Sequence, residues 1–109
     1  MILEHRNLAS GRWNKLSFFE QMANIGSEVS RTMIWRKKNP DYSKKAFDRV
    51  LELLAMSIDD PKNILCLKEL TRLREVLSDY FVFDNEYKSS DILWQKYFYS
   101  YNYASRLNC

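Results

Sequence analysis

Turn-forming residues are rare in this chain, and their scarcity limits the fold more than any other feature. The 109 residues include two glycines and two prolines. A sandwich or barrel of short strands needs turn residues roughly every 8–12 positions, so the sequence predicts a few long elements. Hydrophobic residues make up 46% and charged residues 28% of the chain, which is an ordinary balance for a globular domain. We therefore expect one domain with a hydrophobic core.

The apolar residues recur with the period of an α-helix. Residues three or four positions apart lie on the same side of a helix, and four series with this spacing follow one another along the chain. The series are Phe18, Met22, Ile25, Val29 and Met33; Ala46, Phe47, Val50, Leu53, Leu54 and Ile58; Leu67, Leu70, Leu73, Leu77 and Phe81; and Trp94, Phe98 and Tyr101. This pattern predicts four helices, each with one buried side.

Helix-capping residues precede each series. Side-chain oxygens of Ser, Asn and Asp accept hydrogen bonds from the first free amides of a helix, and proline fits the first helical position. The four start signals are the capping box from Ser17 to Glu20, Asn39-Pro40, Asp60-Pro61 and Ser90-Asp91. They predict helices over about residues 17–37, 39–58, 60–81 and 90–107.

Short connections between long helices force neighbours to run antiparallel. The sequence therefore predicts an all-α fold, a four-helix antiparallel up-down-up-down bundle. Residues 1–16 show no helical period, and we expect a loose N-terminal arm that Trp13 and Leu16 anchor. Residues 17–109 then form the single bundle domain.

Arg74 departs from the apolar pattern of its helix. At about 100° per residue it lies about 40° from Leu70, within the apolar stripe. A buried guanidinium needs a carboxylate partner, because an unpaired buried charge costs several kcal/mol. Glu28 is the first candidate for that partner, and a carboxylate of the loop from Asp84 to Glu86 is the alternative. The expected buried polar cluster is Gln21, Glu28, Arg74 and Asn102. Such a cluster is either a structural ion pair or a small polar pocket, and in a third interpretation Arg74 reaches water at one end of the bundle.

The last predicted helix has a second apolar side. Ile92, Tyr99 and Tyr103 lie within about 40° of one another, opposite Trp94. Aromatic residues are enriched at protein interfaces, and Lys96 and Arg106 would form a polar rim. This side predicts an interface, most simply between copies of the chain. Scattered exposed tyrosines are the plainer interpretation.

Basic residues also gather around the turn between the first two predicted helices. They are Arg36, Lys37, Lys38, Lys44, Lys45 and Arg49. Cations favour helix C-termini, so a solvated helix end explains this group, and a nucleic-acid patch is the alternative. The net charge of +3 is modest for a dedicated nucleic-acid binder.

Catalytic and metal-binding patterns are missing from the sequence. The single histidine, His5, precedes the predicted domain, so a histidine triad or a two-histidine metal site cannot assemble there. Cys66 and Cys109 lack metal-ligand spacing. We expect Cys66 to be a small core residue and Cys109 to be an exposed thiol. We predict no catalytic residues, metal or cofactor. Charged residues near the start and the lack of a long apolar run predict a cytoplasmic protein without a membrane segment.

Three stretches resemble an uncharacterised family of small prokaryotic all-helical proteins. They are KLSFFEQMANIGSEVSR at 15–31, DPKN at 60–63 and DNEYKSSDILWQKYFYSYNYA at 84–104. The resemblance implies a helical domain and brings no known activity. The architecture also looks like that of HEPN-type bundles, many of which are RNases with an Arg followed four to six residues later by His. Arg72 and Arg74 are followed by Tyr80, which departs from that motif.

These observations predict a non-enzymatic cytoplasmic interaction protein that assembles through an aromatic helical face. A homo-oligomer, most simply a dimer, is the first hypothesis, and another protein partner is open. The alternative is an RNA-binding bundle that uses exposed Tyr and Lys/Arg residues, because bases stack on aromatic side chains and phosphates attract cations.

Overall fold

The structure is a computed structural model that describes residues 11–102, and it is helical. Within these residues it contains no β-strand. The α-helices are α2 (Phe18–Trp35), α3 (Pro40–Asp59), α4 (Leu67–Phe81) and α5 (Asp91–Tyr99), and two 3-10 helices are η1 (Pro61–Cys66) and η2 (Ser100–Asn102). The all-helical prediction is confirmed.

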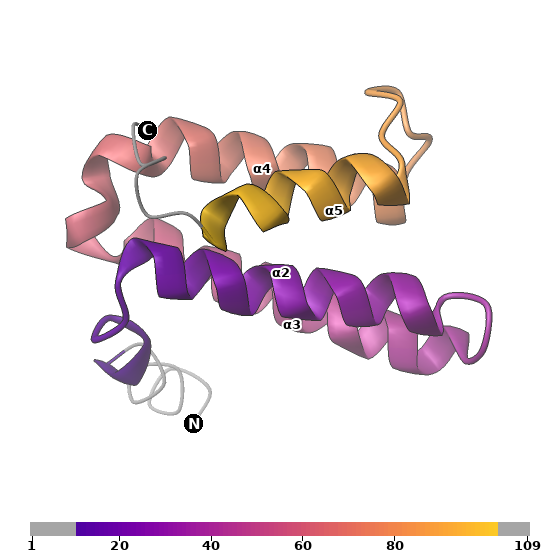
Figure 1. The fold of residues 1–109 in the computed structure, drawn as a ribbon, viewed down its shortest axis with the longest axis horizontal. Coiled ribbons are helices and arrows are strands. Elements are labelled where there is room, and N and C mark those ends of the chain that lie inside the picture. The colour runs from indigo at the N-terminus through magenta and orange to yellow at the C-terminus, as the bar shows by residue number, and fades with distance from the viewer. Residues whose placement is uncertain (1–10, 103–109) are drawn as a thin grey trace.

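The helices pack in a layered arrangement (Figure 1). α2 packs against α3 and α5, and α3 packs against α4. In the view of Figure 1, the turn from α2 to α3 and the loop from α4 to α5 lie at the right, whereas η1 lies at the left. The core lies between the helices and is built from aliphatic residues of α2, α3 and α4 together with Phe18, Phe47, Trp13 and Trp94.

The predicted capping residues start their helices. Ser17 Oγ accepts a hydrogen bond from Glu20 N, and Glu20 Oε1 accepts one from Ser17 N, which completes the capping box of α2. Asn39 caps α3 through its side-chain oxygen. Ser90 caps α5 by accepting from Leu93 N. These ends were predictable because each cap involves residues close in sequence.

The predicted helix over residues 60–81 is divided. Asp60 Oδ1 accepts from Lys62 N as expected of a cap, but the segment that follows is the 3-10 helix η1. Asn63 leaves helical geometry, with φ −94° and ψ 15°, because its side chain is bound inside the protein (see below). The α-helical part therefore begins at Leu67, about two turns later than predicted.

The end of α5 and the state of Cys66 also differ from the sequence-based predictions. α5 ends at Tyr99 and is followed by the 3-10 helix η2, so the predicted α-helix over residues 90–107 is wrong at Ser100–Asn102; residues 103–109 lie outside the described part of the chain. Cys66 is half-buried and packs against the core, as expected of a small core residue, but it is bonded in a disulfide, which the sequence did not predict. Cys109, the expected exposed thiol, lies outside the described residues. The predicted cytoplasmic location stays a prediction.

Trp13 anchors the segment that precedes α2. It is buried, and its indole Nε1 donates a hydrogen bond to Ser57 Oγ at 2.9 Å. Leu16 packs against the same core. Both anchors were predicted from the sequence. Among the described helices, none is long and apolar enough to cross a membrane.

Candidate interaction surfaces

α5 buries one side and exposes the other. Trp94 is its buried residue. On the opposite side, Ile92 is 63% exposed and Tyr99 is 60% exposed, and Lys96 between them is exposed as well. We call Ile92, Lys96 and Tyr99 the α5 outer face. The other two residues predicted for this interface, Tyr103 and Arg106, lie outside the described residues.

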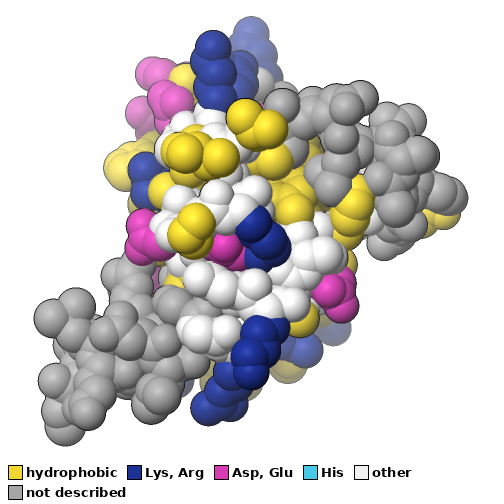
Figure 2. All heavy atoms as spheres, turned by 90° about the vertical axis from the view of Figure 1, so that its left-hand side faces the viewer, with side chains coloured by type: hydrophobic (Ala, Val, Ile, Leu, Met, Phe, Trp, Pro, Cys, Tyr) yellow, Lys and Arg dark blue, Asp and Glu magenta, His cyan; other side chains and the backbone are white. Residues whose placement is uncertain are grey.

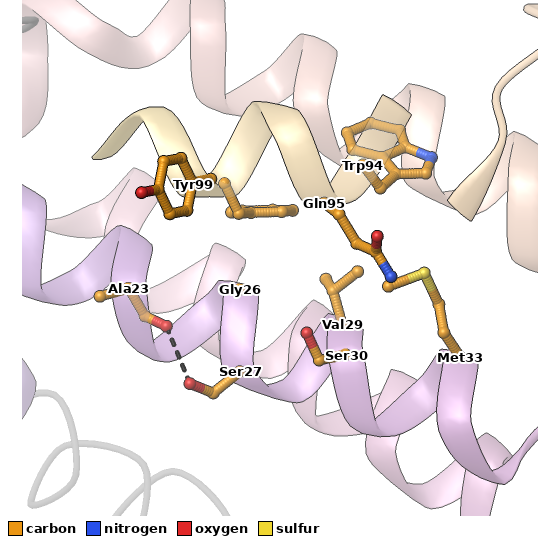
Figure 3. Close-up of a pocket in the computed structure, with 10 residues that line it drawn as sticks. Ala23, Gly26, Ser27, Val29, Ser30, Met33, Trp94, Gln95 and Tyr99 are labelled. Atoms are coloured by element: carbon orange, nitrogen blue, oxygen red, sulfur yellow. Dashed lines mark hydrogen bonds between the residues drawn. The ribbon is translucent and has the colours of Figure 1, made fainter. Parts of the chain in front are cut away.

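A groove between α2 and α5 adjoins this face (Figure 3). Its cavity volume is about 280 Å³. On the α2 side the lining is mostly small, and the lining residues of α2 are Ala23, Gly26, Ser27, Val29, Ser30 and Met33. On the α5 side, Figure 3 shows Gln95 reaching toward Met33 and Tyr99 at the other end. Small side chains on α2 leave room for another chain to approach closely.

Gly26 sets the distance between α2 and α5. A Cβ atom at this position would lie 3.0 Å from Cβ, Cγ and Cδ1 of Phe98. Ordinary carbon contacts are about 3.5–4.0 Å, so the two helices approach more closely here than a larger residue permits.

Aromatic side chains hold α5 from its inner side. Tyr97 OH donates a hydrogen bond to Glu69 Oε2 on α4 and lies beside Tyr101 OH. Burial, and then the bond to the Glu69 carboxylate, raise the pKa of Tyr97. Tyr97 therefore stays protonated at neutral pH and remains a donor to Glu69.

An ion pair fixes the start of α5 to the end of α2. Arg36 Nη2 donates to both carboxylate oxygens of Asp91, at 2.7 and 2.9 Å, and Tyr80 OH donates to the same carboxylate. The guanidinium also lies 5.3 and 5.4 Å from the ring centroids of Tyr80 and Phe81. Burial alone would raise the pKa of Asp91, but the bonds from Tyr80 and Arg36 outweigh it and lower that pKa.

The predicted buried polar cluster does not form around Arg74. Arg74 is exposed, and Glu28 instead pairs with Arg31 one turn away, at 3.0 Å. The side chain of Asn102 is not described. Arg74 lies about 40° from Leu70, but on the side away from Leu73 and Leu77. The buried side of α4 therefore extends from Leu70 toward Leu73 and Leu77 and does not reach Arg74.

Gln21 does lie in a buried polar cluster, with other partners. Its Nε2 donates to Asp60 Oδ2 at 2.8 Å and to Trp13 O at 3.1 Å. Its Oε1 accepts from Asn63 Nδ2 at 2.8 Å, and Asn63 Nδ2 also donates to Ser57 O. This cluster joins α2 to the end of α3 and to η1. Its bonds from Gln21 to Asp60 and from Asn63 to Gln21 span 39 and 42 residues, so no sequence-local signal identified the cluster.

The Asp60 carboxylate is the charged member of this cluster. Burial by itself raises the Asp60 pKa, but bonds from Lys62 and Gln21 outweigh that effect and lower it. Lys62 Nζ donates to Asp60 Oδ2 and to Asn14 O. The ionised carboxylate therefore helps to tie the segment before α2 to η1, which is a structural role.

The basic group near the turn from α2 to α3 divides into paired and exposed residues. Arg36 pairs with Asp91 and Arg49 with Glu52. Arg49 is itself exposed, and the other exposed members are Lys37, Lys38, Lys44 and Lys45. A second basic region lies between α3 and α4, where a groove of about 740 Å³ is lined in part by Lys68, Arg72 and Arg74.

The end of the molecule formed by η1 carries another apolar patch. Ile64 is 67% exposed and Leu65 is 84% exposed. Figure 2 shows this end, with hydrophobic side chains separated by Lys and Arg side chains. The patch is scattered, and it provides a useful position for control substitutions.

Neither metal chemistry nor known relatives assign a function. Within residues 11–102, no group of three or more His, Cys, Asp and Glu side chains is placed to hold a metal ion. No protein family model, curated protein or solved structure matches the chain.

Proposed function

We propose that this chain is a non-enzymatic interaction protein that pairs with a second copy of itself through the α5 outer face, and that its helices form an antiparallel up-down-up-down four-helix bundle. The observation that carries the proposal is the exposure of Ile92 and Tyr99 beside a groove lined by small residues. Aromatic anchors with a polar rim are typical of protein interfaces, and Lys96 with Gln95 supplies such a rim.

A twofold arrangement suits these surfaces. In a symmetric dimer the same patch of each copy meets the other, so Tyr99 of one copy can lie over the small residues of α2 in its partner. The inner contacts of α5, from Tyr97 to Glu69 and from Asp91 to Arg36, keep the outer face in place before a partner arrives. Such preorganisation lowers the entropic cost of association.

Light scattering coupled to size-exclusion chromatography tests the pairing. We expect a mass twice that of the 13.1 kDa chain, with dissociation on dilution. Replacing Tyr99 by Ser should shift the protein to the monomer mass while its melting temperature changes little, because Tyr99 is mostly exposed.

Matched controls separate the face from general effects of lost apolar area. Tyr42 on α3 is 52% exposed and Leu65 on η1 is 84% exposed. Tyr42→Ser and Leu65→Ser should leave the dimer intact, whereas Tyr99→Ser and Ile92→Ser should weaken it. A wild-type chain that stays monomeric at every concentration would refute the proposal.

RNA binding is the second candidate, and the groove between α3 and α4 favours it. Lys68, Arg72 and Arg74 line this groove together with the hydroxyl-bearing residues Thr71 and Ser78. Phosphate contacts release counterions, so affinity for a single-stranded RNA should fall steeply with salt. Fluorescence anisotropy measures the affinity of each variant for a labelled single-stranded RNA. A loss of affinity in Arg74→Gln would indicate the groove, and a loss in Lys96→Gln would indicate the α5 outer face. Salt-independent or absent binding would exclude this candidate.

A further inference from the structure

A pocket opens between the end of α2, the first half of α3 and the end of α4. Its volume of about 580 Å³ falls within the range of about 300–1,000 Å³ that small-molecule sites occupy. The apolar lining consists mainly of Phe47, Leu51, Phe81 and Val82. The Phe47 and Phe81 rings lie 5.3 Å apart and are tilted by 46°. This surface suits an apolar body, and an aromatic ring most of all.

Arg36 lines the same pocket and is already oriented. Both of its hydrogen bonds to Asp91 come from Nη2, and its guanidinium rests on the rings of Tyr80 and Phe81. A guanidinium carries five N–H donors in a fixed plane. Nε and Nη1 carry the other three donors, and none of these three bonds to Asp91. A preoriented arginine with donors beyond those used in its ion pair is suited to a carboxylate.

Two further charged residues line the pocket, Lys44 and Asp48. Both are exposed, and neither forms an ion pair among the described residues. The positive charge of Lys44 attracts an anion, as that of Arg36 does, whereas the negative charge of Asp48 repels it.

We propose that this pocket binds a small carboxylic acid with an apolar body, whose carboxylate meets Arg36 and Lys44 and whose body lies against Phe47 and Phe81. The inference does not rest on the proposed dimer, because none of these residues belongs to the α5 outer face. It predicts opposite effects for the two exposed charges. Removing Lys44 weakens binding, and removing Asp48 strengthens it.

Isothermal titration calorimetry of the full chain tests this site with three probe acids, 4-phenylbutyrate, octanoate and indole-3-acetate. Each acid is compared with an alcohol and an amine that carry the same apolar body. We expect saturable binding in which the acid exceeds the alcohol and the alcohol exceeds the amine. Failure of all three acids to bind, or an amine that binds as well as its acid, would overturn the proposal.

Three exposed-site variants locate the carboxylate. Lys44→Gln should weaken acid binding roughly twofold to fivefold, and Asp48→Asn should strengthen it within the same range, which is typical of exposed charge pairs. Lys45→Gln is the matched control, because Lys45 is exposed and does not line the pocket. Equal weakening by Lys44→Gln and Lys45→Gln would mean a general electrostatic attraction and would also overturn the assignment. All three variants replace exposed side chains and should leave the melting temperature unchanged.

Discussion

The substitution Gly26→Ala tests how tightly α5 is held against α2. In the interior of a helix, alanine is more stable than glycine by about 0.8–1.0 kcal/mol. At this position the new Cβ meets three Phe98 atoms at 3.0 Å, and overpacking of this kind costs about 1–3 kcal/mol. Two of those atoms, Cβ and Cγ, lie close to the α5 backbone, so the ring cannot simply rotate away. The cost exceeds the gain, and we expect a net loss of about 1 kcal/mol.

Thermal unfolding followed by circular dichroism measures this loss. For a domain of this size, about 1 kcal/mol corresponds to a decrease of about 4–8 °C in the melting temperature. Gly11→Ala is the matched control, because Gly11 is also helical and a Cβ there meets nothing within 4 Å. That variant should be neutral or slightly stabilising, as helix propensity alone dictates.

A double-mutant cycle assigns the loss to Phe98. In the background of Phe98→Ala, which removes Cγ and Cδ1, Gly26→Ala should cost much less or become stabilising. The coupling between the two positions should then be about 1 kcal/mol. If Gly26→Ala instead raised the melting temperature as much as Gly11→Ala does, the close packing of α2 on α5 would be refuted.

Three further predictions concern the polar contacts. Gln21→Leu should lower the free energy of unfolding by about 2–4 kcal/mol, because it removes three buried hydrogen bonds, to Asp60 Oδ2, Asn63 Nδ2 and Trp13 O; urea denaturation measures this, and a loss below about 1 kcal/mol would mean that these bonds contribute little to stability. Ser17→Ala should cost about 0.5–2 kcal/mol through loss of the cap, and an unchanged denaturation midpoint would contradict it. The pKa of Asp91 is lowered from 3.8, so its contribution is present above about pH 3.8 and is lost as the pH falls through the lowered pKa. Asp91→Asn should therefore reduce the acid sensitivity of the melting temperature, and identical pH profiles would contradict it.

The parts of the fold that were predictable depend on neighbours in sequence. A capping box involves residues three positions apart, and a buried helical side needs only the 3.6-residue period. These signals located the starts of α2, α3 and α5 and most of the core. Asp60-Pro61 gave the correct place for a helix start but not its type, because the local backbone of η1 is determined by the bonds of Asn63 to Gln21 and Ser57.

The candidate site was less predictable, for a related physical reason. Angular position on a helix says which residues share a side, but the width of the buried arc depends on which helices pack there. Arg74 lies at the edge of that arc and is exposed, whereas Ile92 and Tyr99 lie opposite Trp94 and are exposed as expected. The ion pair between Arg36 and Asp91 joins positions 55 residues apart, and a single sequence carries no signal for such a pairing.

That same ion pair lies between the two proposed surfaces. Asp91 begins α5, whose outer side is the proposed dimer face, and Arg36 lines the pocket proposed for a carboxylate. A bound carboxylate that used only Nε and Nη1 would leave the bonds to Asp91 intact, so binding and pairing would be independent. A carboxylate that displaced Asp91 would release the start of α5, and the acid would then weaken the dimer. Measuring the dimer dissociation constant with and without 4-phenylbutyrate distinguishes these cases, because binding linkage requires the acid affinity to change by the same factor on pairing.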